Sequence, residues 1–364
     1  KPIPYGRQYT TDEDVQTVIE TLKSDYLTQG PKIQEFEQAF AAYVGSKYAL
    51  AVNNATAGLH LSAIALGVEG GDNVIVTSMT FAASANCMRY CNANVTFCDI
   101  DPETYLIDLN RIYELLEKSP EGYYKGIVAV DFAGYPVNLE KLREIADEHG
   151  LWILEDACHA PGGYFMDSKN EKQYCGNGKF AELAVFSFHP VKHIAIGEGG
   201  MITTNNRELY EKISLYRSHG ITKDASRLHE NHGGWYYEMQ ELGYNYRLTD
   251  FQAALGISQL KRSDWGLRKR QDIANRYSEA FSKVDGIKIP VVTNDVFHAY
   301  HLYIIQVKDR LGLYNYLKEN NIFTQVHYIP VHLLPYYKQL DNKKGNLPFV
   351  EEYYEHCLSL PMYP

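Results

Sequence analysis

The sequence has few cysteines, no long apolar run and no excess of positive charge, and each absence excludes a class of protein. Its six cysteines are scattered over 364 residues without a CxxC pair, which does not fit the disulfide framework of a small secreted domain. Its most apolar stretch, residues 59–68, is far shorter than the roughly 20 residues that cross a bilayer. The formal net charge of −10 argues against nucleic acid as the main partner, because neutralising phosphates takes a surface rich in Lys and Arg. We therefore expect a cytoplasmic protein with reduced cysteines that binds neither membrane nor nucleic acid. Small anionic ligands are not excluded, because a few local groups are enough to bind them.

The chain is too long for one ordinary hydrophobic core, so two domains are predicted. Short apolar stretches alternate with helical patterns in its first part, which is typical of βαβ units. The clearest unit has strands at 127–132 and 151–156 around a helix at 139–146. Continuous apolar strands belong in a mostly parallel sheet that helices cover on both faces. We predict a large α/β domain over residues 1–255 and a smaller α+β domain over residues 256–364.

Helix and strand patterns also fix several boundaries outside that unit. Thr11, followed by three acidic residues, is a predicted helix start, and this helix is expected to end near Gly30. In the smaller domain we predict helices at 263–281 and 310–319, and strands at 287–289, 302–307 and 323–328.

A lysine that follows a buried strand is the first candidate for chemistry. Lys192 comes four residues after the end of the apolar stretch 184–188, and the glycine-rich segment 197–200 precedes the next strand. A lysine in a partly dehydrated pocket has a lowered pKa and can attack an aldehyde. Most lysines between strands are solvated, however, so this position needs independent support.

A carboxylate at the end of a neighbouring strand gives that support. Asp156 ends the strand at 151–156, at the edge where parallel sheets bind ligands. Such a carboxylate can pair with a protonated pyridine nitrogen, although Asp at a strand end is also a common turn residue. His159 could bond a ring hydroxyl, while a single histidine is more often structural.

The turn at 53–58, between a strand and a helix, is a third candidate. Its free amides and the helix dipole suit a phosphate group, but it is neither a P-loop nor GxGxxG, and alone it indicates an ordinary turn. Ser187 could add a hydroxyl to the same phosphate. Phe81 could cover a ring face or simply be a core residue.

Taken together, these segments resemble the DegT/DnrJ/StrS family of nucleotide-sugar aminotransferases, which have fold type I of the pyridoxal-phosphate (PLP) enzymes. The resemblance covers nearly the whole chain. The segments that carry it are residues 27–31, 54–59, 155–159, 187–192, 197–200, 243–250 and 326–332.

The resemblance implies a role for each candidate. Lys192 would hold PLP as a Schiff base, Asp156 would bind the pyridine nitrogen, and His159 would lie near the ring hydroxyl. The residues implied at the cofactor phosphate are Ala55, Thr56 and Ser187.

The resemblance also implies a second subunit. Asn245 falls where family members reach the cofactor phosphate of the partner, so a homodimer with shared active sites is expected. The residues expected on the sugar-nucleotide side are Thr28, Tyr246, Arg247, His327, Tyr328 and His332.

The implied reaction is transamination from L-glutamate to a nucleotide-linked keto-sugar, with Lys192 as both acid and base. Segments 187–192 and 235–245 are most similar to the branch that aminates C4 of a UDP-linked 2-acetamido-2,6-dideoxy-4-hexulose in pseudaminic acid biosynthesis. Relatives acting on GDP- or dTDP-linked 4-keto-6-deoxyhexoses share the cofactor motifs and stay open as alternatives.

Two positions depart from the family pattern. Ala55 stands where many relatives have Gly, which requires an ordinary φ there. His193 follows the lysine, and a related branch of dehydratases has His at the lysine position itself; the presence of Lys192 favours a transaminase.

Other classes fit less well. A non-catalytic regulator would need a DNA-binding element, and none is indicated. A zinc enzyme would need more ligands than His327 and His332, whose spacing does not share a helical face, so we expect no metal. A cysteine desulfurase would need a nucleophilic cysteine on a mobile loop, and no cysteine in this sequence has a recognisable loop setting.

Overall fold

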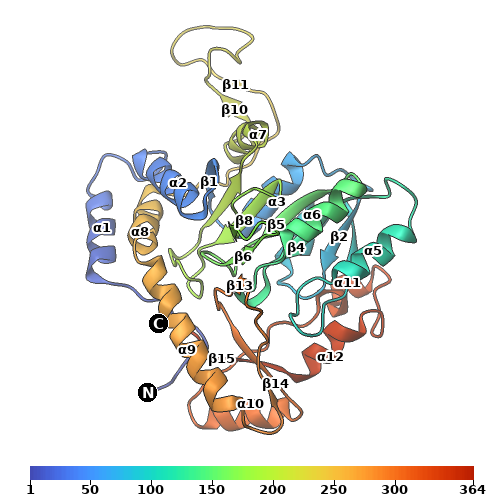
Figure 1. Cartoon of the computed structure of the whole chain (residues 1–364). Helices are drawn as coiled ribbons and strands as arrows, with labels where there is room; N and C mark the ends of the chain where they lie inside the picture. The colour runs from blue at the N-terminus through green and yellow to red at the C-terminus, as the bar shows by residue number, and fades with distance from the viewer.

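A seven-stranded sheet in the order β1-β9-β8-β5-β4-β2-β3 forms the centre of the computed structural model, which describes all 364 residues (Figure 1). Its strands are β1 (Tyr48–Val52), β2 (Asn73–Thr77), β3 (Asn94–Cys98), β4 (Tyr124–Val130), β5 (Trp152–Asp156), β8 (Leu183–Ser187) and β9 (Gly200–Thr204). Only β9 runs antiparallel to its neighbours, and the other neighbouring strands are parallel. The predicted mostly parallel sheet is confirmed.

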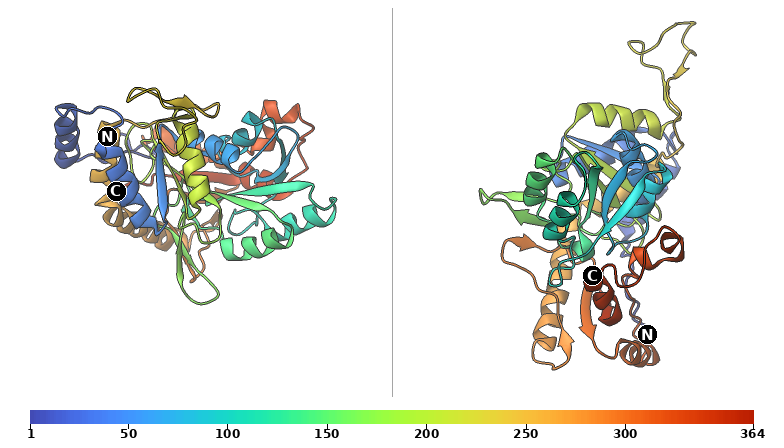
Figure 2. Two further views of the ribbon diagram at one scale, coloured as in Figure 1. Left: turned by 90° about the horizontal axis from the view of Figure 1, so that it is seen from above. Right: turned by 90° about the vertical axis from the view of Figure 1, so that its right-hand side faces the viewer.

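Helices cover both faces of this sheet (Figure 2). They are α3 (Ala55–Ala65), α4 (Ala83–Tyr90), α5 (Leu109–Glu117), α6 (Leu139–Glu148) and α7 (Arg207–Arg217). Alternate residues of a strand point to opposite faces. In β4, Ile127 packs in a core with residues of α5 and α6, whereas Val128 packs in a core with residues of α3, α4 and α7. This burial on two faces explains why the strands are continuously apolar.

The N-terminal part forms two helices where one was predicted. Thr11 begins α1 (Asp12–Leu22) with a capping box, as expected, but α1 ends well before Gly30. A second helix, α2 (Pro31–Val44), then begins with proline in its first turn, where a missing amide hydrogen costs nothing. Its start is fixed from far away, because the Asp250 carboxylate accepts hydrogen bonds from the amides of Gly30 (2.8 Å) and Lys32 (3.0 Å).

The C-terminal part builds a second sheet from β12 (Ile287–Lys288), β14 (Tyr303–Val307) and β15 (Cys357–Leu360). Helices α9 (Ser263–Phe281) and α10 (Arg310–Glu319) have the predicted bounds. The predicted strand at 323–328 is wrong. Gln325 pairs with Ser359 through two backbone hydrogen bonds and the amide of Phe323 donates to Ile3 at 2.8 Å, but these isolated contacts form no strand. The unpredicted β15 takes the place beside β14. Helix α8 (Asp250–Leu260) continues across residue 255, and the division into two domains stays a prediction.

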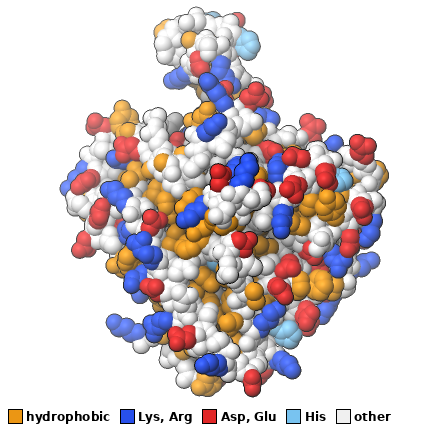
Figure 3. All heavy atoms as spheres, in the orientation of Figure 1, with side chains coloured by type: hydrophobic (Ala, Val, Ile, Leu, Met, Phe, Trp, Pro, Cys, Tyr) orange, Lys and Arg blue, Asp and Glu red, His pale blue; other side chains and the backbone are white.

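The remaining elements are short. A small sheet contains β6 (Tyr164–Met166), β7 (Lys172–Tyr174) and β13 (Val296–Phe297), and two further helices are α11 (Pro335–Lys338) and α12 (Pro348–His356). Strands β10 (Ile221–Thr222) and β11 (Glu238–Met239) form the base of an arm that projects from the body (Figures 1 and 3). No helix has both the length and the apolar character needed to cross a bilayer.

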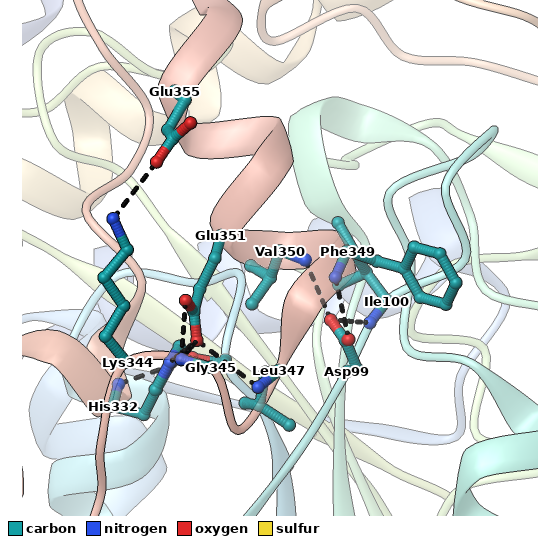
Figure 4. A network of polar contacts seen from close by, with 11 residues as sticks. Asp99, Ile100, His332, Lys344, Gly345, Leu347, Phe349, Val350, Glu351 and Glu355 are labelled. Atoms are coloured by element: carbon teal, nitrogen blue, oxygen red, sulfur yellow. Dashed lines mark hydrogen bonds and ion pairs between the residues drawn. The ribbon is translucent and has the colours of Figure 1, made fainter.

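Asp99, directly after β3, joins the C-terminal segment to the main sheet (Figure 4). Helix α12 has no side-chain cap of its own at its first residues. The Asp99 carboxylate accepts from the amides of Phe349 (3.0 Å) and Val350 (2.9 Å) instead, and also from the amide of Ile100. The free amides at the start of α12 are thereby satisfied by a residue that directly follows a strand of the large sheet.

Candidate active site

A cavity of about 630 Å³ lies beyond the carboxyl ends of β5 and β8, beside the start of α3. This volume is in the range of known ligand sites. Of the eight residues expected at the cofactor, all but Asn245 line it: Ala55, Thr56, Phe81, Asp156, His159, Ser187 and Lys192. From the C-terminal part, His301, His327 and Tyr328 line the same cavity. The structure therefore brings together segments that are far apart in the sequence.

Lys192 lies in this cavity without an ion-pair partner. Its Nζ is 3.4 Å from Nε2 of His301, a long hydrogen bond. Burial lowers the pKa of Lys192 to about 8, although the nearby Cys158 and Asp156 partly oppose that shift. A larger share of the amine is therefore neutral near physiological pH than for an exposed lysine, as a nucleophilic lysine requires.

Asp156 lies buried at the end of β5 and faces the same cavity. One carboxylate oxygen accepts from the hydroxyl of Ser84 at 2.6 Å, and the other accepts from the amide of Cys158 at 3.2 Å. These bonds fix the orientation of the carboxylate. Because a carboxylate oxygen can accept more than one hydrogen bond, Asp156 can still bind a cationic N–H from the cavity.

The start of α3 offers a cradle for an anion. Asn54 caps the helix by accepting from the amide of Ala57 at 2.8 Å, so the amides of Ala55 and Thr56 have no partner within the chain. Ala55 has an ordinary helical φ, which explains why alanine is tolerated there. Gly200 of β9 is required for close approach, since a Cβ at that position would lie 2.8 Å from the amide nitrogen of Ala55.

The arrangement fits PLP. The free amides of the α3 start and the hydroxyl of Ser187 suit its phosphate, Asp156 suits its pyridine nitrogen, and the Lys192 amine suits its aldehyde. These roles stay proposals. Neither Lys192 nor Asp156 forms an ion pair with another side chain, so no charged group has to be displaced when PLP binds. A phosphate, a ring nitrogen and an aldehyde are matched within a single cavity.

His159 and Tyr328 form a hydrogen-bonded pair at the cavity wall. Nδ1 of His159 accepts from the amide of Ala133 at 3.2 Å, so the ring proton is on Nε2 and points to the Tyr328 hydroxyl, also at 3.2 Å. Burial raises the pKa of Tyr328, and its own hydroxyl hydrogen is left free to donate. The expected contact of His159 with a cofactor hydroxyl stays a prediction.

Five expected site residues lie outside the cavity. Asn245 and Thr28 are exposed, and Arg247 is half-buried. The hydroxyl of Tyr246 is 3.3 Å from His60. In a single chain, none of these four reaches the groups that line the cavity.

The expectation for His332 requires correction. Its ring is fully buried, with Nδ1 at 2.7 Å from the Ser78 hydroxyl and Nε2 at 3.1 Å from the Glu351 carboxylate (Figure 4). Glu351 in turn accepts from the amides of Gly345 and Leu347. Both ring nitrogens are bonded inside the protein, so His332 stabilises the C-terminal segment and has no free nitrogen for a substrate.

His301 was missed from the sequence. It lies just before β14 and does not end or follow a parallel strand. The strand-end pattern that identifies Asp156 and Lys192 is therefore missing at His301. Its loop reaches the cavity because the amide of Ala299 donates to Gly134 at 2.7 Å and the amide of Leu302 donates to Ala133 at 3.1 Å. Two histidines within four residues, His298 and His301, were the only available signal.

Comparison with known proteins agrees with this geometry. The chain matches the DegT/DnrJ/EryC1/StrS aminotransferase family over residues 8–364. It is 40% identical to the spore coat polysaccharide biosynthesis protein SpsC of Bacillus subtilis, covering 100% of this chain and 92% of SpsC. It is 38% identical to a UDP-4-amino-4,6-dideoxy-N-acetyl-beta-L-altrosamine transaminase of Campylobacter jejuni, covering 99% and 92% of the two chains.

A solved structure is similar over the whole length. Helicobacter pylori PseC, an aminotransferase involved in the biosynthesis of pseudoaminic acid, superimposes with a TM-score of 0.88 at 32% identity, covering 100% of this chain and 94% of PseC.

Proposed function

Because the chain belongs to the DegT/DnrJ/EryC1/StrS family of PLP-dependent sugar aminotransferases, we propose that it transfers an amino group from glutamate to the C4 keto group of a nucleotide-linked 4-keto-6-deoxy sugar. The observation that carries this proposal is the buried Lys192, placed in one cavity with Asp156 and the free amides of α3. The substrate we propose is UDP-2-acetamido-2,6-dideoxy-β-L-arabino-hexos-4-ulose, of pseudaminic acid biosynthesis.

The residues of the cavity divide the work of this reaction. Bound PLP supplies an electron sink for the carbon that carries the amino group. Lys192, with its lowered pKa, would be the base that removes the proton from the donor's α-carbon and the acid that gives it back. Asp156 holds a proton on the ring nitrogen. The start of α3 and Ser187 anchor the phosphate, so the reacting carbon stays within reach of Lys192.

The C-terminal part supplies the proposed sugar side. His327 and Tyr328 line the cavity together with Tyr5, whose ring centroid is 5.4 Å from that of His327. The free hydroxyl hydrogen of Tyr328 can donate to a sugar oxygen. Both polar and apolar contacts are thus available to a hexose ring, whereas nothing in the cavity selects one nucleotide base.

The substrate is tested by supplying glutamate, PLP and one 4-keto-sugar nucleotide at a time. We expect the UDP-linked 2-acetamido sugar to yield an amino-sugar, detected by mass spectrometry, with kcat/KM at least about tenfold above the GDP- and dTDP-linked 4-keto-6-deoxyhexoses. A preference for one of the latter would assign the chain to the perosamine type. No amination of any of them would contradict the proposed reaction.

We also propose that the protein is a homodimer whose two active sites are shared. Large apolar side chains are exposed on the projecting arm at Trp235 (75% exposed) and Met239 (63%), and just after it at Leu242 (78%). Exposed large apolar side chains on an extended arm are typical of a surface that a partner covers. Asn245 follows this arm and is exposed, as a residue that serves the partner's site must be.

A complementation experiment tests the shared site. Lys192→Ala and Asn245→Ala chains, each of which we expect to be inactive as a homodimer, are mixed under conditions that exchange subunits. We expect about a quarter of the wild-type activity, because half of the dimers are mixed and one of their two sites then has both residues intact. Activity no higher than the sum of the separate variants would contradict the shared site.

A further inference from the structure

His301 is the only side chain within hydrogen-bond distance of the Lys192 amine, with 3.4 Å between Nε2 and Nζ. The ring is 4% exposed and lines the same cavity as Lys192. Its centroid lies 4.3 Å from that of His159. A hydrogen bond of this length is typical of a catalytic group before its ligands are bound.

The surroundings of the second ring nitrogen, Nδ1, determine whether His301 donates or accepts in this hydrogen bond. Burial lowers the pKa of His301 well below its usual range, so the ring is neutral and carries a single proton. Nδ1 of His301 is buried and has no partner. A buried N–H without an acceptor is rarer in proteins than a bare acceptor, so the proton is on Nε2 and Nε2–H donates to the lone pair of the Lys192 amine.

This direction favours the neutral amine. A protonated Lys192 has no lone pair and could only donate to Nε2. The ring would then have to carry its proton on Nδ1, where it has no acceptor. The same contact therefore stabilises the nucleophilic form of Lys192 and opposes the ammonium form.

The position of His301 is fixed by the backbone around it. The buried Arg270 donates to the carbonyls of Tyr300 (3.1 Å) and His301 (3.3 Å). Gly134 has a φ of +98°, and a Cβ at Gly134 would lie 2.9 Å from the amide nitrogen of Tyr300 and 3.0 Å from that of His301. The loop that carries Tyr300 and His301 can thus lie this close to the segment after β4 only because residue 134 is glycine.

We propose that His301 is a positioning residue that donates a hydrogen bond from Nε2 to Lys192 and holds its amine neutral and directed into the cavity. The proposal rests on the proposed role of Lys192. The titratable and charged side chains that act on this pair are Asp156, Cys158, His159, His193, Arg270 and His327.

The tautomer is measured directly by nitrogen NMR of the full chain without PLP, with ¹⁵N-labelled histidine and the His301 signals assigned by their loss in His301→Gln. We expect a protonated Nε2 and a bare Nδ1 at neutral pH. In Lys192→Met the Nε2 signal should shift, because its acceptor is gone. A proton on Nδ1, or a signal indifferent to Lys192→Met, would overturn the proposal.

The pH dependence of Lys192 separates positioning from packing. Reaction of the PLP-free chain with an amine-selective reagent, quantified at Lys192 by peptide mass spectrometry, should follow the neutral amine with a midpoint near pH 8. His301→Leu removes the donor, so we expect the midpoint to rise by about one pH unit, a roughly tenfold change in equilibrium. His301→Gln keeps an N–H donor and should stay near wild type.

The sign of the shift is the discriminating result. If His301 only filled space, an apolar leucine would make the surroundings of Lys192 less polar and the midpoint would fall or stay unchanged. Either of those results would overturn the proposal. Neither measurement uses the transamination assay, so a failed substrate test and a failed His301 test can be told apart.

Discussion

Replacing Lys192 with alanine is expected to remove the visible absorption of lysine-bound PLP and to lower kcat by about 10⁴-fold or more. Lys192 is the only lysine that lines the cavity, so no neighbour can replace its amine. The variant loses both the covalent anchor and the group that moves the proton. Absorption spectra after addition of PLP, together with turnover of glutamate and the keto-sugar, measure both effects.

A matched lysine provides the control for this variant. Lys118, an exposed residue after α5 that pairs only with Glu114, is changed to alanine in parallel. We expect Lys118→Ala to retain the spectrum and the activity. Circular dichroism should show all three proteins folded. Continued turnover by folded Lys192→Ala would mean that another group performs the proton transfer.

The second large effect is expected at Asp156. In Asp156→Asn the side chain keeps its shape and can keep the hydrogen bond with Ser84, but it loses its negative charge. A neutral amide does not hold a proton on the ring nitrogen, so bound PLP becomes a weaker electron sink. We expect kcat to fall by about 10²- to 10³-fold, comparable to the loss of one strong electrostatic contact in an active site.

Ser84→Ala distinguishes charge from orientation. This variant removes the 2.6 Å hydrogen bond but leaves the carboxylate charged. We expect it to lower kcat by about tenfold or less, as the loss of one hydrogen bond would. If Asp156→Asn were no worse than Ser84→Ala, the charge of Asp156 would not be what the reaction needs.

The central sheet was predictable because its strands are buried on both faces. In β4 and β5 every residue from 127 to 130 and from 153 to 156 is buried, and the sequence shows apolar runs at 127–130 and 151–154 that are followed directly by acidic residues. Contacts between distant residues were not predictable. The start of α2 depends on Asp250, and the third strand of the C-terminal sheet is β15 because residues 357–360 pair with β14.

The residues of the candidate site likewise divide into those that the sequence predicts and those that it does not. Asp156 ends one predicted strand and Lys192 comes soon after another. Parallel strands bring their carboxyl ends to one edge of the sheet, so the meeting of the two residues follows from the fold. His301 reaches them only through the contact of its loop with Gly134. His332 lies in one of the segments that resemble the family, but its ring hydrogen-bonds to Ser78 and Glu351 inside the protein. These contacts join distant parts of the chain and could not be predicted from the sequence.

The proposed mechanism depends most on which lysine carries the cofactor. Reducing the PLP-loaded protein with borohydride fixes the cofactor to its lysine, and peptide mass spectrometry then locates it. We predict the phosphopyridoxyl group on Lys192, with the label released from that position when glutamate is added before reduction. A label on any other lysine, or a label on Lys192 that glutamate does not release, would contradict the account.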